Sequence, residues 1–249
     1  MNETSGVRLR MAVLALLAGA ACSSPANPAS VANGEMLFQS KKLSSAPIDI
    51  FTCATCHDTA TSAPASIKAG ALLAGVTGRA SFWGGMEGDL LAAVNDCRRY
   101  FMSDRQALAN DDPAAESLYA YLQTLEPGST APVPFTVVSV IADVARGDAG
   151  HGATVYAQTC GNGCHGDMHT GTGRLSGAIP ILPDDVLASH ATYTVATQRL
   201  VFIEKTRHGG FYGYTGVMPP FSTEVLSDGD LGDLLEALGV TGVAPDASP

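Results

Sequence analysis

Two short stretches of the chain place a pair of thiols directly before an imidazole. The first is CATCH, Cys53 to His57, and the second is CGNGCH, Cys160 to His165. A covalently bound haem needs two thiols about one helical turn apart to reach its vinyl groups, and a histidine directly after them to reach the iron. Both stretches therefore predict an attached haem. The predicted cofactor-binding residues are Cys53, Cys56, His57, Cys160, Cys164 and His165.

The second stretch has one residue more between its cysteines than the usual pattern. Gly161 and Gly163 flank Asn162 there. Glycine and asparagine tolerate positive φ, so we expect them to let the chain bulge between the two cysteines. The composition of CGNGCH is then the one that a bulged attachment site needs.

Two other kinds of site use the same residues. A CxxC pair in an exported protein can be a redox dithiol or a disulfide, and two such pairs can hold one zinc ion. Against the dithiol, a histidine follows the second cysteine in both stretches, and no βαβ pattern surrounds either. Against zinc, predicted helices and a linker separate Cys56 from Cys160. Haem remains the favoured interpretation, with these two as alternatives.

An electron-transfer haem commonly has methionine sulfur as its second iron ligand. In the second half of the chain, GVMPPF offers Met218, and the two prolines after it stiffen its loop. His208 in RHGG is the rival ligand. Met168 and His169 are too close to His165 along the chain to reach the opposite side of the iron.

The second ligand of the first site is less clear, because NDCRRYFMSD contains both Cys97 and Met102. We favour Met102, with Cys97 second and Met86 third. A cysteine thiolate would lower the haem potential strongly and suggest a different chemistry. Alternatively, Cys97 is a small buried thiol on one helix face with Leu90 and Val94. The predicted metal ligands are His57, Met102, His165 and Met218.

The elements around the two motifs repeat in the same order. One unit runs over residues 33–125 and the other over 146–240, with an extended linker at 126–145. Each unit has a helix-forming segment before its cysteines, GEMLFQSKKL from Gly34 and GATVYAQT from Gly152. Each has a middle helix, near 89–100 or 195–206. The stretch SKKLSSAPIDIFT makes the entrance to Cys53 longer, so we expect the first entrance helix to be displaced.

Each unit closes on an amphipathic helix. Asp112 can cap the first with Pro113 at its first turn, whereas Ser227 and Asp230 can cap the second, which stops at Gly239. Apolar residues recur at helical spacing in both. These residues are Leu118, Tyr121, Leu122 and Leu125 in the first helix, and Leu231, Leu234, Leu235 and Leu238 in the second.

Composition limits the kind of partner. The chain has 249 residues, of which 46% are hydrophobic, and 14 Lys+Arg stand against 24 Asp+Glu for a net charge of -10. One or two domains with a real core are possible at this length. A nucleic-acid partner is disfavoured, because it would require a basic face, whereas a basic protein partner suits this charge.

The N-terminus predicts export. Arg8 and Arg10 precede the apolar run 11–21, which is typical of a signal peptide at 1–21 and too short for a transmembrane helix. LAGAAC resembles a bacterial lipoprotein processing box, which implies lipid attachment at Cys22; the alternative is an ordinary secretory signal cleaved near Ala21. A Pro- and Ser-rich tether at 22–32 would follow, and a tail at 241–249 ends the chain. We expect a periplasmic lipoprotein without a transmembrane helix in its mature form.

Together the motifs resemble the bacterial class I cytochrome c family. The resemblance rests on CATCH with LYAYLQTL, on YAQTCGNGCHG, on VMPPF and on the closing leucine-rich helix. It implies an all-α fold of two tandem cytochrome c-like domains, each wrapped round a covalently attached haem c. It also implies that Cys53, Cys56, Cys160 and Cys164 are thioether anchors, that His57 and His165 are proximal ligands, and that Met102 and Met218 are distal ones.

The resemblance implies a carrier rather than an enzyme: a dihaem cytochrome that relays single electrons between redox proteins of the bacterial envelope. One alternative is a haem enzyme of sulfur-compound oxidation, similar to thiosulfate dehydrogenases, with Cys97 as an iron ligand. A dihaem peroxidase is a weaker alternative, because both irons have methionine candidates. A third possibility is an electron-transfer subunit of a larger dehydrogenase.

Overall fold

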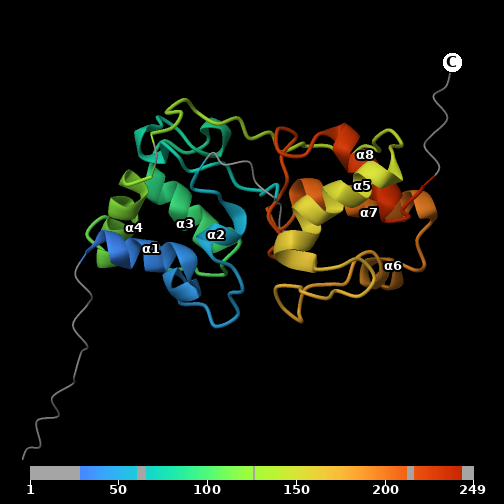
Figure 1. The fold of residues 1–249 in the computed structure, drawn as a ribbon, viewed down its shortest axis with the longest axis horizontal. Helices are drawn as coiled ribbons and strands as arrows, with labels where there is room; N and C mark the ends of the chain where they lie inside the picture. The colour runs from blue at the N-terminus through green and yellow to red at the C-terminus, as the bar shows by residue number, and fades with distance from the viewer. Residues whose placement is uncertain (1–28, 61–65, 126, 212–215, 243–249) are drawn as a thin grey trace, which may run out of the picture.

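The structure is a computed structural model that describes residues 29–60, 66–125, 127–211 and 216–242. Within these residues the regular structure is helical, and only an isolated bridge pairs Phe82 with Glu87. Helices α1 to α4 gather in one lobe and α5 to α8 in another (Figure 1). The predicted all-α fold is confirmed. The predicted signal peptide, Cys22 and most of the tether and tail lie outside the described residues.

In the first lobe, α1 (Val31–Gln39) packs against α4 (Pro113–Gln123). The hydroxyl of Ser30 caps α1 by accepting the Asn33 N–H at 3.1 Å, so the helix begins inside the segment predicted as tether. Asp112 caps α4, with Pro113 in the first turn, as predicted. The helices cross closely at Gly34, where a Cβ atom would overlap the carbonyl oxygen of Ser117.

The second lobe repeats this crossing. Helix α5 (Ala149–Tyr156) packs against α8 (Asp228–Ala237), and a Cβ atom on Gly152 would overlap the carbonyl oxygen of Asp233. Since α1 meets α4 as α5 meets α8, the expected displacement of the first entrance helix is wrong. The additional residues before Cys53 form the 3₁₀ helix η1 (Lys41–Leu43) and a loop instead.

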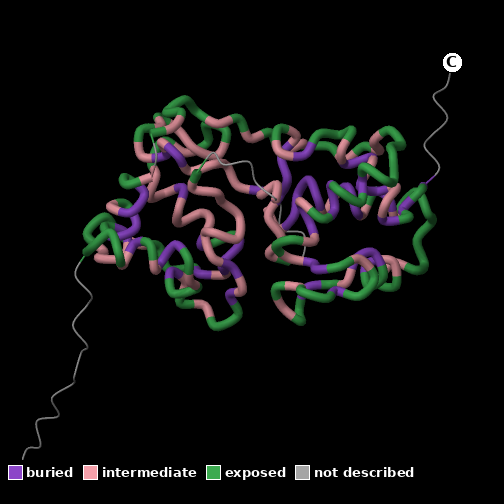
Figure 2. Tube along the Cα trace, viewed as in Figure 1, coloured by how far each residue is buried: buried purple, intermediate pink, exposed green. Residues whose placement is uncertain are grey.

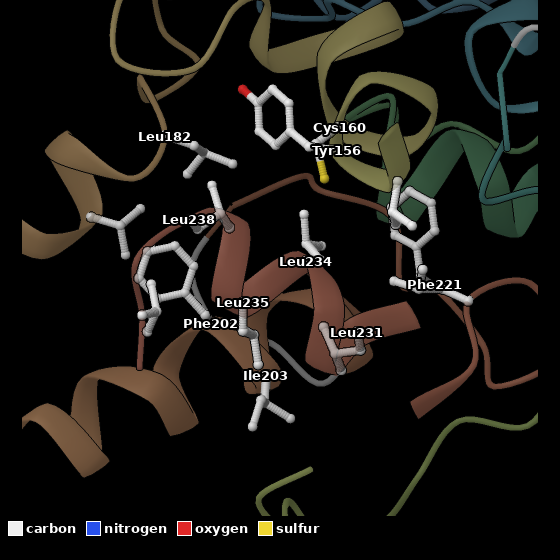
Figure 3. Close-up of a cluster of buried hydrophobic side chains, with 14 of the residues drawn as sticks. Tyr156, Cys160, Leu182, Phe202, Ile203, Phe221, Leu231, Leu234, Leu235 and Leu238 are labelled. Carbon is white, nitrogen blue, oxygen red and sulfur yellow. The ribbon is translucent and has the colours of Figure 1, made fainter. Parts of the chain in front are cut away.

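In chain order, the remaining helices lie between the two members of each pair. They are α2 (Cys53–Cys56), α3 (Leu90–Tyr100), α6 (Asp184–Ser189) and α7 (Val195–His208), with 3₁₀ helices η2 (Val76–Gly78) and η3 (Trp83–Gly85). The buried stretches lie along the inner faces of both lobes, and the exposed ones follow the outer loops (Figure 2). The leucines of α8 meet Phe202 and Ile203 of α7 in the second core (Figure 3). Full burial of each such side chain contributes about 1.5–3 kcal/mol.

The segment between the lobes, residues 127–147, contains no helix and runs along both lobes (Figure 1). The ring of Phe135 meets Trp83 of the first lobe edge-on, with centroids 5.3 Å apart, and lies 6.3 Å from Phe211 of the second. A backbone hydrogen bond of 2.8 Å from Ile67 to Gln158 also joins the lobes directly. No helix among the described residues is long and apolar enough to cross a membrane.

Candidate functional site

The first motif forms its own short helix, α2, with Cys53 at its start and Cys56 at its end. A capping box holds this helix: the Thr55 N–H donates to the Thr52 hydroxyl at 3.2 Å, and the Thr52 N–H donates to the Thr55 hydroxyl at 3.1 Å. The threonines satisfy backbone donors that a helix start leaves unpaired. The two thiols are thereby held one turn apart, with His57 directly after the helix.

The imidazole of His57 is fixed by its own backbone environment. Its Nδ1 atom lies 2.7 Å from the carbonyl oxygen of Ala71, which can only accept, so Nδ1 carries the proton. Burial lowers the pKa of His57, which keeps the ring neutral. Gly70 packs flush against the ring, because a Cβ atom there would come within 2.6 Å of Nδ1. The Nε2 atom is left to bind a metal, as in most metal-ligating histidines.

His57, Cys53 and Cys56 line a cavity of about 360 Å³ in the first lobe. Both candidate distal ligands, Met102 and Cys97, line the same cavity. The other lining residues are mostly apolar and include Phe38, Leu43, Phe51, Val76, Phe82, Trp83, Leu90, Val94, Phe101, Leu118 and Leu122.

The two candidates differ in chemistry rather than in place. Cys97 lies on the apolar face of α3 with Leu90 and Val94, and burial raises the pKa of its thiol, which disfavours the thiolate. Met102 is buried among the core residues and needs no deprotonation. Met86 is 60% exposed and does not line the cavity, so the structure argues against it as a ligand.

The second motif continues α5 as a wide helical turn. Residues Ala157–His165 form a π-helix (η4), with the Gly166 N–H donating to the Gly161 carbonyl at 3.2 Å. A π-helical turn holds one more residue than an α-helical one, which accommodates the third residue between Cys160 and Cys164. The expectation of positive φ at residues 161–163 is wrong. The backbone stays on the negative side there, and φ becomes positive only at Gly166.

His165 repeats the arrangement of His57. Its Nδ1 atom lies 2.9 Å from the carbonyl oxygen of Pro180, and burial lowers its pKa. The hydroxyl of Tyr156 donates to the Gly166 carbonyl at 2.8 Å and closes the turn that follows. A cavity of about 410 Å³ is lined by His165 together with Cys160, Cys164 and Met218.

The rivals of Met218 lie elsewhere. The Nε2 atom of His208 is 2.7 Å from the carbonyl oxygen of Val138, and this side chain lines neither cavity. His169 is exposed and its Nδ1 lies 3.0 Å from Asp184. The structure therefore leaves Met218 as the ligand candidate on the wall of the second cavity.

The two motifs are close in space, which the sequence does not predict. Cys56 of the first lobe lines the second cavity with Cys164. Lys68 lines it as well, and its ammonium donates to the carbonyls of Ala54 at 2.8 Å and His57 at 3.2 Å. The ammonium also pairs with the carboxylate of Asp58 at 2.9 Å. Nothing in the sequence around Lys68 marks it, because all of these partners lie earlier in the chain, in or next to the first motif.

This proximity bears on the zinc alternative. Separation of the cysteines is not a valid argument against zinc, since Cys56 and Cys164 share a cavity. The described cysteines nevertheless form no metal-binding cluster. Among the described residues, one group of three or more His, Cys, Asp or Glu side chains has its ligand atoms within 4.8 Å of one another, and it consists of His151, Asp230 and Asp233. The five described cysteines are all free thiols.

The donor set of each cavity fits a covalently attached haem. Each has the two thiols of its own motif, a third cysteine (Cys97 in the first cavity and Cys56 in the second), an imidazole whose Nδ1 is already bonded to a carbonyl, and a methionine thioether. The mostly apolar lining of the first cavity suits the macrocycle, whereas the second cavity is lined by polar as well as apolar side chains, among them Thr55, Lys68 and Gln158. In both cavities a neutral imidazole with thioether sulfur suits the iron. In both sites the hydrogen bond from Nδ1 to a backbone carbonyl holds the ring in the orientation that a ligating histidine needs.

Part of the chain matches a known family. Residues 147–236 match the family model described as "Cytochrome C oxidase, cbb3-type, subunit III". No curated protein matches. The matched residues include α5 to α7, the π-helix, His165, Met218 and all of α8 except Ala237. The match supports a cytochrome c family for this part of the chain, and with it a covalently bound haem c and haem-based electron transfer.

Proposed function

We propose, from the cytochrome c domain at residues 147–236, that the whole chain is a dihaem c-type cytochrome that relays single electrons between redox proteins of the cell envelope. The observation that carries this proposal is the repeated histidine environment. In both lobes an imidazole directly follows two thiols, donates its Nδ1 proton to a backbone carbonyl, and lines a cavity with a methionine.

When bound, each haem supplies an iron that cycles between the ferric and ferrous states and so carries one electron. The chain's own residues hold and tune it. Cys53 and Cys56 in the first lobe, and Cys160 and Cys164 in the second, would form the thioether bonds. The carbonyls of Ala71 and Pro180 orient the two histidines. The apolar side chains of the first cavity exclude water, which disfavours the more highly charged ferric state there and raises the potential of that site.

Met102 is the distal ligand that we propose for the first site. It is a thioether in the same cavity as His57, and it binds iron without losing a proton, whereas burial opposes ionisation of Cys97. Met218 is the proposed distal ligand of the second site, and Pro219 and Pro220 after it restrict its loop.

A haem enzyme of sulfur-compound oxidation is the second candidate function. The observation that favours it is the position of Cys97, which lines the first cavity together with Cys53, Cys56 and His57. In that case Cys97 rather than Met102 would bind the iron. The third possibility, an electron-transfer subunit of a larger dehydrogenase, has the same sites as a free carrier.

Location and partners are part of the proposal. The N-terminal pattern supports export to the periplasmic side and a lipid anchor at Cys22, both outside the described residues. The net charge of -10 suits an encounter with a redox protein that presents a basic surface.

Spectra and redox titration of protein made in a host with haem-maturation machinery test the carrier against the enzyme. The carrier predicts low-spin spectra, reversible one-electron reduction at two sites, and no turnover of thiosulfate. Thiosulfate oxidation that Cys97→Ser abolishes would instead establish the enzyme.

A further inference from the structure

One segment of the second lobe belongs to both cavities. Met218 lines the second cavity, and the next residue, Pro219, lines the second and the first. Pro220, Ser222, Glu224 and Val225 then continue along the wall of the first cavity. The cavity that contains His57 is therefore closed by residues from the other lobe. We call residues 218–225 the shared wall.

The shared wall is held firmly against α7. The buried guanidinium of Arg207 donates through Nη1 to the carbonyls of Phe221 at 3.1 Å and Leu226 at 2.7 Å. The Gly210 N–H donates to the Met218 carbonyl at 2.8 Å, next to Gly209, where a Cβ atom would overlap that carbonyl oxygen. Hydrogen bonds of this kind favour one arrangement of the backbone. A shift of Met218 would accordingly move the residues after it.

The segment between the lobes, which we call the strap, is hydrogen-bonded to the shared wall. Thr136 donates its N–H at 2.9 Å and its hydroxyl at 2.5 Å to the carboxylate of Glu224. These hydrogen bonds lower the pKa of Glu224 to about 2, so the acceptor stays charged even in moderately acidic solution. The strap residues just before Thr136, Val133, Pro134 and Phe135, also line the first cavity. The hydrogen bonds between Thr136 and Glu224, which we call the clasp, thus join two walls of the first site.

We propose that the shared wall couples the two haem sites, because one segment supplies the distal ligand of the second site and excludes water from the first. This inference rests on the proposed function. A change in the ligation of Met218 would alter water access to the first site and hence its potential. Coupling between two sites at equilibrium is reciprocal. Reduction at the first site would therefore change the equilibrium for Met218 ligation at the second site by the same factor.

The test uses the full-length holoprotein and the variant Thr136→Val, which removes one hydrogen bond of the clasp without changing any charge. Thr136 is exposed, so the substitution should leave folding intact. The matched control is Thr192→Val, an exposed threonine of the second lobe that lines neither cavity. Met218→Ala is the second variant. The midpoint potential of each site is measured by spectroscopic redox titration, and Met102→Ala identifies the first site.

We expect Thr136→Val and Met218→Ala to lower the midpoint of the first site, because water that enters stabilises the ferric form. A tenfold change in the oxidised-to-reduced ratio corresponds to 59 mV for a one-electron couple. If the midpoint potential of the first site is the same in Thr136→Val and Met218→Ala as in the control Thr192→Val, the coupling is overturned. The mass of each protein gives its haem count separately. One haem would contradict the dihaem proposal, and Thr136→Val would still decide whether the second lobe closes the first site.

Discussion

The Nδ1 atom of His165 lies 2.9 Å from the carbonyl oxygen of Pro180, and this contact decides which ring nitrogen is available to a metal. A carbonyl accepts only, so the proton sits on Nδ1 and the lone pair on Nε2. His57 makes the same contact with Ala71 in the first lobe. Two separate segments therefore prepare an imidazole in the same way, although their cysteine spacings differ.

Replacing Gly70 by alanine should damage the first site selectively. The new Cβ atom would overlap the His57 ring and would also lie 2.7 Å from the carbonyl oxygen of Cys56, so the ring or the backbone must shift. Overpacking of this kind costs about 1–3 kcal/mol. Thermal unfolding and visible spectra measure the effect, with Gly88→Ala as the control, because a Cβ atom there meets nothing within 4 Å. Equal stability and spectra for the two variants would contradict the role given to Gly70.

Deletion of Gly163 should leave attachment at the second motif intact. The deletion turns CGNGCH into CGNCH, which has the usual spacing, and removes a residue whose Cβ position is open. We expect the π-helical turn to become α-helical, since the π-turn exists to hold one additional residue. Intact mass should show the same haem count as the parent protein. Loss of one haem would mean that the π-helix itself is needed to align Cys160 with His165.

The helices and their caps could be predicted from sequence because they depend on local patterns. Asp112 and Ser227 cap α4 and α8, and the leucine stripe of α8 is buried, as the periodicity indicates. The π-helix could not be predicted, because nothing local distinguishes a wide turn from a bulge at glycine. Its form depends on the continuous path from α5 to His165.

The contacts between the lobes could not be predicted at all. Glu224 and Thr136 are far apart in the chain, and neither belongs to a motif. The same holds for Pro219, whose position between the cavities depends on how the lobes pack. The candidate site residues could be predicted because thioether attachment requires two cysteines and a histidine at a fixed spacing in the sequence. The residues that line a cavity need only be apolar, so no sequence pattern identifies them.

Met102→Ala and Cys97→Ser distinguish the two ligand candidates of the first site. Loss of the buried Met102 side chain should cost about 2–5 kcal/mol of stability and convert the first haem to high spin with a lower potential. Cys97→Ser should leave spectra and potentials unchanged. Visible spectroscopy and redox titration of both variants provide the measurement. Loss of low-spin character in Cys97→Ser, with Met102→Ala unaffected, would favour the enzyme.

The ion pair of His151 and Asp233 predicts a pH dependence of stability. The hydrogen bond to Asp233, at 2.6 Å, raises the pKa of His151, and the same contact lowers the pKa of Asp233. Because the pKa of His151 is raised in the folded state, its ion pair stabilises the fold fully at a pH below the unfolded pKa near 6.5. This stabilisation is lost as the pH rises through the folded pKa. Because the pKa of Asp233 is lowered in the folded state, this carboxylate contributes stability at a pH above its unfolded pKa near 3.8. That contribution is lost as the pH falls through the folded pKa.

The variant His151→Gln should therefore be less stable than the parent protein at about pH 5, between the two unfolded pKa values, and should approach it in alkaline solution. Thermal melting over a pH series measures the difference. A difference between the two proteins that does not change across the series would rule out titration of this pair as its cause.

The haem content of the mature chain tests the central claim most directly. Intact mass and peptide mapping of protein matured in a host with haem-attachment machinery would locate each haem. We predict two, one on the peptide with Cys53 and Cys56 and one on the peptide with Cys160 and Cys164. A single haem on CATCH, with the thiols of CGNGCH free, would contradict the dihaem account. The absence of haem from both motifs would overturn the electron relay and also the proposal that the first lobe is a cytochrome domain.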